Sequence, residues 1–453
     1  MAESSAIAPR ELPRRLGLVT GMAVVVGVII GSGIFRVPSP IAAAAGNLTG
    51  ITLVWVLGGI IALFGALSIA ELAAMYPAAG GPYVYLREAY GRPLAFLFGW
   101  MWLLTEPISW AAQSLMFAEY LAYFVRIHAA AQHLIAAALV SLVAAANCRS
   151  VRLGAAIQNL SAGAKILAFV GLSAAIFILA PGGQANPLHA EPMGAANWSG
   201  IGIGLVGALW AYDGCENLTT LSGEFKDPQR NLPIALIGGI LVVIAAYLLL
   251  NAALLRALPL PQLAASKSVA ADAAAAVLGR AGASLAAALV MLSVFGTLNG
   301  SILSSPRVFF AMAEDGLFFR TVGRIHPKFE TPYVAIGFIA VLAVIYVLLR
   351  DFMQLAEGYV LGVWPFLALS IIGLFILRRR RPDFPRAYRV LGYPVVPALF
   401  VLATFAVVAN ALYAQFWSTI VSILITLAGV PVYLLWMAWQ RRRSVIVAPS
   451  RSR

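Results

Sequence analysis

The residues best suited to holding a small ligand lie at Gly31-Ser32-Gly33, in the middle of an apolar run from about Leu16 to Gly46. Two glycines around a serine form helix poorly, and within lipid an unwound backbone is tolerated only where protein or a cavity lines it. We therefore expect two half-helices that meet near the middle of a membrane, the second beginning near Ser32. Free N–H groups and the positive end of a helix dipole at that position suit an anionic group.

A second break is expected at Ala211-Tyr212-Asp213-Gly214, in the sixth apolar segment. Transporter folds are built from repeats that carry broken helices in matching positions, so two breaks predict a binding site between them. The alternative is a glycine hinge that only bends one helix.

A zwitterionic ligand would fit between these breaks. The N–H groups of Ser32, Gly33 and Ile34 suit its carboxylate, and the dipole alone contributes about 0.3–2 kcal/mol. Carbonyl groups near Ile29, Trp210 and Ala211 suit its ammonium group. Gly33 also lets a ligand approach the backbone closely.

Charged residues near the second break have a structural interpretation as well. The spacing Asp213-x-x-Glu216 is that of a capping box, in which Asp213 would cap the second half-helix and Glu216 would reach back to it. The alternative for Asp213 is direct contact with the ligand.

Two charges lie inside predicted membrane segments, Glu106 in the third and Lys165 in the fifth. A charge at mid-helix costs about 2.5–3.5 kcal/mol on insertion scales, so each is a candidate functional residue. A structural partner for a polar group is the alternative for Glu106, and snorkelling to the membrane surface is the alternative for Lys165.

Composition assigns the chain to the membrane proteins. Of its 453 residues 61% are hydrophobic and 11% are charged, whereas a soluble domain carries roughly 25% charged residues. The two cysteines predict neither a disulfide framework nor a metal site, and no cofactor is expected. No metalloprotease, nucleophile-elbow or phosphate-loop motif is present in the sequence, which argues against a membrane enzyme.

Hydropathy predicts twelve transmembrane helices, at about 16–46, 49–75, 93–125, 129–146, 154–180, 199–222, 232–255, 284–312, 332–349, 355–377, 395–414 and 416–439. The net charge of +13 comes mostly from lysine and arginine in alternate connections, so the positive-inside rule places both termini in the cytoplasm. This distribution argues against a nucleic-acid partner. The same distribution predicts that the arginine clusters at 378–381 and 441–443 determine the orientation of the protein in the membrane and contact lipid headgroups. The few basic residues left on the outer side are Arg36, Arg126, Arg256, Lys267, Arg280 and Arg350.

Several separate motifs resemble the amino acid–polyamine–organocation superfamily, and most closely its L-type amino acid transporter branch. They are the Gly-Ser-Gly-Ile-Phe break, the Pro-x-x-Gly-Gly-Pro-Tyr stretch after the second span, and the segments 147–165, 210–233 and 295–307. The resemblance implies a five-plus-five inverted-repeat (LeuT-like) fold with helices 1 and 6 broken. The repeats would span 16–180 and 199–378, followed by accessory helices at 395–439, with cytoplasmic tails at 1–15 and 440–453.

The resemblance also implies roles for particular residues. Trp210 matches an aromatic gate over the substrate, with membrane-facing packing as its alternative. Sodium-coupled relatives of this fold hold a cation where Lys165 would place its ammonium group, and Glu106 matches a position at which cationic-type relatives carry glutamate. The substrate-binding residues expected are Ile29, Ile30, Gly31, Ser32, Gly33, Ile34, Trp210, Ala211 and Asp213.

We therefore expect a secondary active transporter of amino acids, of neutral L-amino acids in particular, in a bacterial-type inner membrane. It would work by alternating access as a sodium-independent exchanger or a proton symporter. The loop near 126–133 lacks the cysteine with which some relatives bind an accessory chain, so no disulfide-linked subunit is expected. The alternatives are a carrier of polyamines or cationic amino acids, a channel and an intramembrane enzyme.

Overall fold

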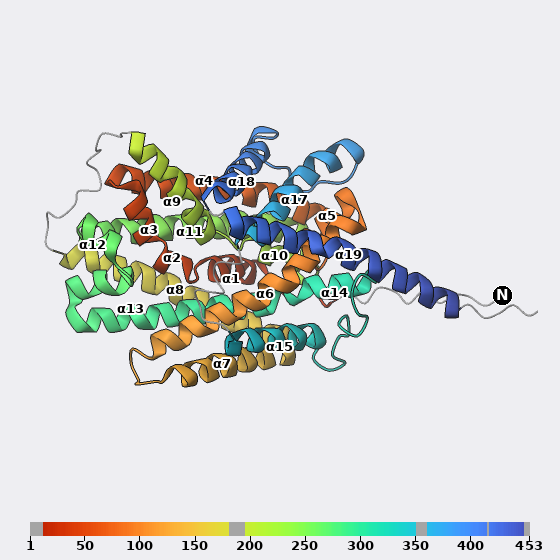
Figure 1. Ribbon diagram of the computed structural model, residues 1–453, viewed down its shortest axis with the longest axis horizontal. Helices are drawn as coiled ribbons and strands as arrows, with labels where there is room; N and C mark the ends of the chain where they lie inside the picture. The colour runs from red at the N-terminus through yellow and green to blue at the C-terminus, as the bar shows by residue number, and fades with distance from the viewer. Residues whose placement is uncertain (1–11, 181–194, 350–359, 415, 448–453) are drawn as a thin grey trace, which may run out of the picture.

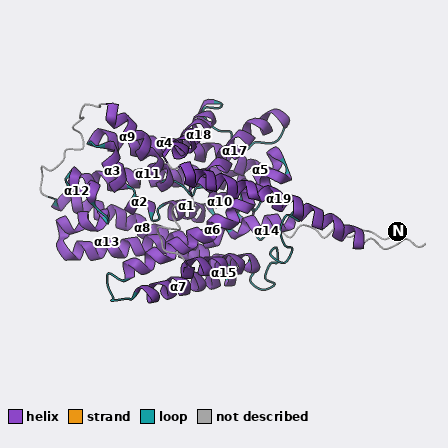
Figure 2. Ribbon diagram, in the orientation of Figure 1, coloured by secondary structure: helices purple, strands orange, loops and turns teal. Residues whose placement is uncertain are grey.

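The computed structural model of the protein describes residues 12–180, 195–349, 360–414 and 416–447. Within these ranges the secondary structure is helical, apart from an isolated bridge between Leu16 and Phe225 (Figure 2). Seven helices in this part of the chain are long and apolar enough to cross a membrane. The protein is therefore an all-α membrane protein. Most of the N-terminal tail, residues 181–194, Arg350 and residues 448–453 of the C-terminal tail lie outside the described residues.

The first part of the chain forms eight helices (Figure 1). They are α1 (Leu18–Ile29), α2 (Gly33–Arg36), α3 (Pro38–Ala45), α4 (Leu48–Met75), α5 (Pro82–Tyr90), α6 (Arg92–Leu121), α7 (Ala129–Arg149) and α8 (Val151–Leu179).

The remaining helices follow the gap at 181–194. They are α9 (Ala195–Ala211), α10 (Glu216–Thr220), the 3-10 helix η1 (Ser222–Glu224), α11 (Pro228–Ala257), α12 (Leu260–Ala265), α13 (Val269–Ser304), α14 (Pro306–Glu314), α15 (Tyr333–Leu349), α17 (Val360–Arg380), α18 (Val395–Ala414) and α19 (Phe416–Val447). Each of the twelve predicted segments overlaps one or more of these helices.

Local sequence signals explain where several helices begin. The side chain of Asn47 accepts a hydrogen bond from the backbone N–H of Gly50 at 2.7 Å and caps α4. Ser150 caps α8 by accepting from the N–H of Leu153 at 3.3 Å. Proline occupies the first turn of α3, α5, α6, α11 and α14, where its missing N–H costs nothing.

The broken helix α1–α2 is the centre of the packing. Of its apolar stretch 83% is buried, whereas only 6% of the corresponding stretch of α19 is buried. Helix α1 packs against α8, α11 and α13, and α9 packs against α3 and α4. Helices α18 and α19 pack on the outside, against α4, α6 and α17. The residues that could form a site are therefore enclosed by the other helices.

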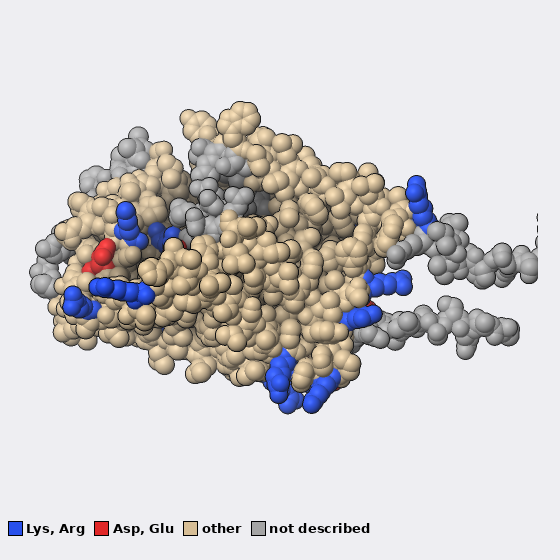
Figure 3. Space-filling model, turned by 60° about the horizontal axis from the view of Figure 1, so that its bottom comes forward, with Lys and Arg blue, Asp and Glu red and all other residues tan. Residues whose placement is uncertain are grey.

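The outer surface matches a lipid environment. Leu160, Leu167 and Ile178 on α8 are 75–78% exposed, although their side chains are large and apolar. In Figure 3 the lysine and arginine side chains in view gather toward the ends of the molecule, with an uncharged surface between them. Such a belt is expected where hydrocarbon covers the protein.

Both ends of the described chain lie at the same end of the bundle. Arg15 forms an ion pair with Glu330, in the loop between α14 and α15, and its backbone N–H donates to the carbonyl of Glu224 at 2.8 Å. Trp436 of α19 donates from Nε1 to the carbonyl of Gly316, in that same loop, at 2.9 Å. We call this the terminal end of the bundle.

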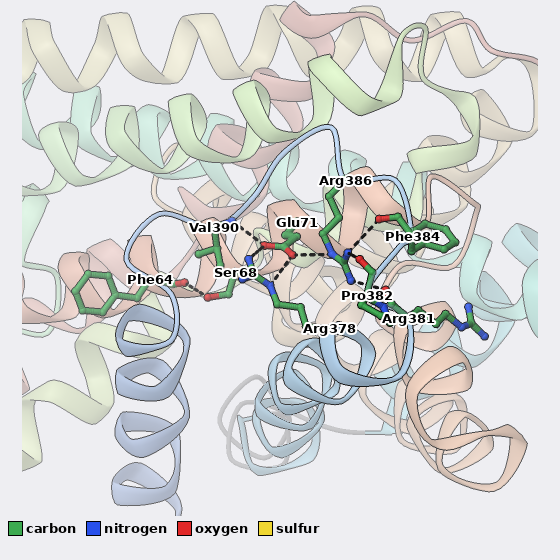
Figure 4. Close-up of polar contacts among 9 residues, drawn as sticks. All are labelled: Phe64, Ser68, Glu71, Arg378, Arg381, Pro382, Phe384, Arg386 and Val390. Carbon is green, nitrogen blue, oxygen red and sulfur yellow. Dashed lines mark hydrogen bonds and ion pairs between the residues drawn. The ribbon is translucent and has the colours of Figure 1, made fainter.

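A buried ion-pair cluster lies where α4 and α17 finish (Figure 4). Glu71 is fully buried, and its carboxylate accepts from Arg378 at 2.5 and 2.9 Å and from the N–H of Val390 at 2.7 Å. Arg386 lies 3.5 Å from the same carboxylate. The prediction that the 378–381 cluster contacts headgroups is therefore wrong for Arg378, because a buried acid that the sequence analysis overlooked pairs with it.

Candidate functional site

Both predicted helix breaks are present. Helix α1 ends at Ile29 and α2 begins at Gly33, so Ile30 to Ser32 are unwound. Helix α9 ends at Ala211 and α10 begins at Glu216. Gly214, between them, has φ +117°, a backbone conformation that favours glycine. The two breaks face each other across a small cavity.

This cavity has a volume of about 60 Å³. Six of the predicted ligand-contacting residues line it: Ile29, Ser32, Gly33, Trp210, Ala211 and Asp213. Ile30, Gly31 and Ile34 do not line it, and Ile30 and Ile34 are fully buried in the surrounding packing. The prediction of direct contact is therefore not met for those three in this structure.

The backbone N–H groups of Ser32, Gly33 and Ile34 donate to no other group in the described part of the chain. Buried N–H groups are nearly always paired, so the unpaired donors of Ser32 and Gly33, which line the cavity, suit an anionic ligand. Gly33 has a further role here, because a Cβ atom added to it would lie 3.0 Å from the Cα atom of Ala211. The glycine lets the two breaks approach closely.

Tyr247 of α11 connects the two breaks, and the sequence analysis missed it. Its hydroxyl group lies 2.9 Å from the carbonyl oxygen of Ile29 and 3.0 Å from that of Ala211. Its ring centroid lies 5.0 Å from that of Tyr212 and 5.7 Å from that of Trp55, which fixes its position. A single tyrosine on an apolar helix gives no sequence signal for this contact.

The capping box predicted at Asp213 and Glu216 is wrong. Helix α10 begins at Glu216 with Cys215 at its N-cap, and no side chain caps it. The left-handed turn at Gly214 leaves Asp213 outside the helix, where it lines the cavity. Glu216 is fully buried and accepts from the side chain of Asn217 at 3.3 Å.

Helix α6 supplies one wall of the cavity. Ser109 and Gln113 line it, and Glu106 precedes them by three and seven residues, which is the spacing of one helix face. Glu106 is 1% exposed. The Oε1 atom of Gln113 is buried and has no hydrogen-bond partner in the part of the chain that the structure describes.

Lys165 does not line the cavity and is completely buried. Its ammonium group donates to the carbonyl oxygens of Gly27 at 2.7 Å and Ile30 at 2.8 Å, and to the hydroxyl of Thr297 at 3.2 Å. Ser293 donates to the same Ile30 carbonyl at 2.8 Å. The alternative that Lys165 snorkels to the surface is therefore wrong, because its head is held among acceptors of α1 and α13.

The remaining residues that line the cavity were not predicted to bind the ligand. They are Val28, Ser109, Gln113, Gly214, Asn217, Thr297 and Ser301. Thr297 and Ser301 could have been found from the sequence, because they are four residues apart in a polar stretch of α13 and so lie on one face of that helix. Among the described residues, no group of three or more His, Cys, Asp or Glu side chains could hold a metal ion.

Known proteins similar to this chain are transporters. The family described as amino acid permease matches residues 16–437. The serine/threonine exchanger SteT of Bacillus subtilis is 34% identical over 93% of this chain and 96% of its own length. The human b(0,+)-type amino acid transporter 1 is 31% identical over 95% of this chain and 89% of its own, and the human cystine/glutamate transporter is 30% identical over 95% and 87%. The resemblance found in the sequence motifs is confirmed: this chain belongs to the amino acid permease family and is an amino acid transporter.

Proposed function

We propose that the cavity between the two helix breaks binds small neutral L-amino acids, which the protein carries across the membrane by alternating access. The observation that carries this proposal is the pair of unused N–H donors at Ser32 and Gly33, which line the cavity together with Ile29 and Ala211, the residues whose carbonyls end the first half-helices. The donors suit a carboxylate and the carbonyls suit an ammonium group.

The walls of the cavity support the choice of a small substrate. Ser109, Gln113 and Asn217 give it polar sides, and its volume of about 60 Å³ leaves little room for a large side chain. The exchanger of serine and threonine among the relatives supports the same class. Trp210 lines the cavity where an aromatic gate would close over the substrate.

The position of Lys165 supports a sodium-independent mechanism. Its ammonium group is held by α1 and α13 as a bound cation would be, so that position needs no sodium ion. The driving force is then exchange against a second amino acid or symport with a proton, for which Glu106 is the candidate carrier.

The proposed architecture has twelve transmembrane helices, in two inverted repeats of five with α18 and α19 as accessory helices. Both chain termini would lie in the cytoplasm of a bacterial-type cell, with the protein in the plasma membrane. The carrier would act without a disulfide-linked accessory chain.

Uptake into proteoliposomes tests the proposal. We expect saturable uptake of small neutral L-amino acids that is stimulated by the same amino acid inside the vesicle and unchanged when potassium replaces sodium. Amides and esters of the substrate should compete poorly, because they lack the carboxylate. Equal competition by the amide would contradict the carboxylate site, and a preference for lysine or putrescine would favour a cationic carrier instead.

A further inference from the structure

A second, larger cavity lies at the terminal end of the bundle, away from the helix breaks. Its volume is about 840 Å³. The start of α6, the loop after α14 and the last turns of α19 form its walls. The transport mechanism proposed above uses only the cavity between the breaks and does not involve this second cavity.

The walls are held in place by specific contacts. The carbonyl of Gly316 accepts from Trp436 and also from the side chain of Gln440. Arg92 donates to the carbonyl of Asp315 at 2.6 Å. The rings of Phe319 and Trp436 meet edge to face with centroids 5.0 Å apart. The cavity is therefore a built feature of the loop and the two helices.

The lining of the cavity contains both basic and aromatic side chains. Arg92, Arg320 and Arg441 line the cavity, and all three are exposed. Of the two acids in the lining, Asp315 is already paired with Arg87 at 2.5 Å, which leaves Glu314 as the acid beside Arg92 and Arg320. The balance is positive, so the complementary ligand carries negative charge.

The aromatic residues of the lining and their surroundings indicate a lipid. Trp436 and Trp439 have ring centroids 5.1 Å apart, and tryptophan is the residue that gathers at the level of membrane headgroups. On the same helix, Leu434 and Leu435 are 61% and 70% exposed. A ligand in this cavity would thus have arginines around its head and an apolar helix surface beside its tail.

We propose that this cavity binds an anionic phospholipid from the adjacent membrane leaflet. The arginines hold its phosphate and headgroup, and its glycerol and upper acyl chains lie against the tryptophans of α19. Arginine matches phosphate oxygens with paired N–H donors, and each basic residue near an anionic membrane surface contributes about a few-fold in affinity. The lipid would join α19 to α6 and to the loop after α14.

Native mass spectrometry of the detergent-purified protein tests the proposal, with phosphatidylglycerol and phosphatidylcholine added at equal concentration. We expect the wild-type protein to retain phosphatidylglycerol in preference, and Arg92→Gln/Arg320→Gln to retain about tenfold less. Arg324→Gln is the matched control, because Arg324 is exposed on the same loop but does not line the cavity. Arg320→Gln alone should lower retention severalfold, and it removes no hydrogen bond of the wall.

Three outcomes would overturn the proposal. The first is equal retention of both lipids by the wild type. The second is the same loss of lipid in Arg324→Gln as in the double variant. The third is complete displacement of the lipid by glycerol phosphate, which would show that the cavity binds only a phosphate group. Trp439→Ala should weaken lipid retention without changing charge, and unchanged retention there would contradict the placement of the acyl chains. Thermal unfolding of each variant shows whether it remains folded.

Discussion

The buried ammonium group of Lys165 donates to two carbonyl oxygens of the first helix break and its approach and to the hydroxyl of Thr297. We expect Lys165→Ala to lower the transport rate about tenfold or more and to lower expression less, because buried acceptors that lose a donor cost about 1–3 kcal/mol. Lys165→Arg should restore little, since a Cβ on Gly296 would already lie 2.8 Å from Lys165 Cε and no space remains for a planar guanidinium. Rates normalised to folded protein in proteoliposomes measure this. A fully active alanine variant would reject the surrogate-cation role.

Glu106 provides a second test of a single residue, in this case of its role in proton coupling. If its carboxyl group carries the coupling proton, an inward proton gradient should drive accumulation in the wild type. Glu106→Gln, which cannot take up or release a proton, should then lose the pH dependence of accumulation and retain exchange. Accumulation is measured with and without an imposed pH difference. Unchanged gradient-driven accumulation in the variant would make Glu106 a structural residue.

Sequence reasoning predicted some of these residues and not others, for identifiable reasons. The lining by Ser32 and Asp213 was predictable, because the helix breaks are visible as interruptions of apolar periodicity. The position of Lys165 beside the first break was expected from the family resemblance. The bridge by Tyr247 was not, because it depends on how α11 is rotated against two other helices.

Among the helical elements, the joint between the two breaks depends on the absence of a side chain at Gly33. We expect Gly33→Val to abolish transport and also to lower thermal stability, by about 1–3 kcal/mol, because its Cβ would press on the backbone of Ala211. Gly202→Val is the control, since nothing lies within 4 Å of a Cβ placed there on α9. Uptake and thermal unfolding in detergent measure both effects. Equal losses in the two variants would contradict the close-packing argument.

The junction of α4, α17 and the loop that follows α17 depends on Glu71. Glu71→Gln should destabilise the protein by about 2–4 kcal/mol, because Arg378 and the nearly buried Arg386 would lose their counter-charge. Glu88→Gln is the control: its partners Arg87 and Arg381 are 30% and 44% exposed, and such pairs contribute about 0–1 kcal/mol each. Apparent melting temperatures in one detergent compare them, and similar shifts would show that Glu71 acts as an ordinary surface charge.

The sequence predicted helices where long apolar runs exist and missed what lies between them. The stretch 258–283 was expected to be an outer loop, yet it forms α12 and the start of α13, interrupted at Gly279 with φ +62°. Short alanine-rich segments lack the apolar length that marks a span. The Glu71–Arg378 pair joins residues 307 positions apart, so only the packed helices reveal it.

For the whole molecule, the distribution of charge predicts orientation. With both termini in the cytoplasm, a fluorescent protein fused to the C-terminus should fluoresce, and alkaline phosphatase fused there should be inactive. Phosphatase fused after Lys267, in the connection between α12 and α13, should be active because that connection is expected on the outer side. Activity ratios of the two fusions measure this, and a reversed ratio would contradict the positive-inside assignment.

The ammonium group of Lys165 is covalently attached to the chain, which has a thermodynamic consequence. A dissolved ion that binds on one side and leaves on the other delivers the free energy of its gradient once in every cycle. A tethered cation returns to its starting point and performs no such work, although it fills the same set of acceptors. If Lys165 takes the place of a coupling ion, as proposed, uphill movement of substrate is powered by a second solute that leaves the protein, either a proton or an exchanged amino acid. With neither available, the carrier can only bring concentrations to equality.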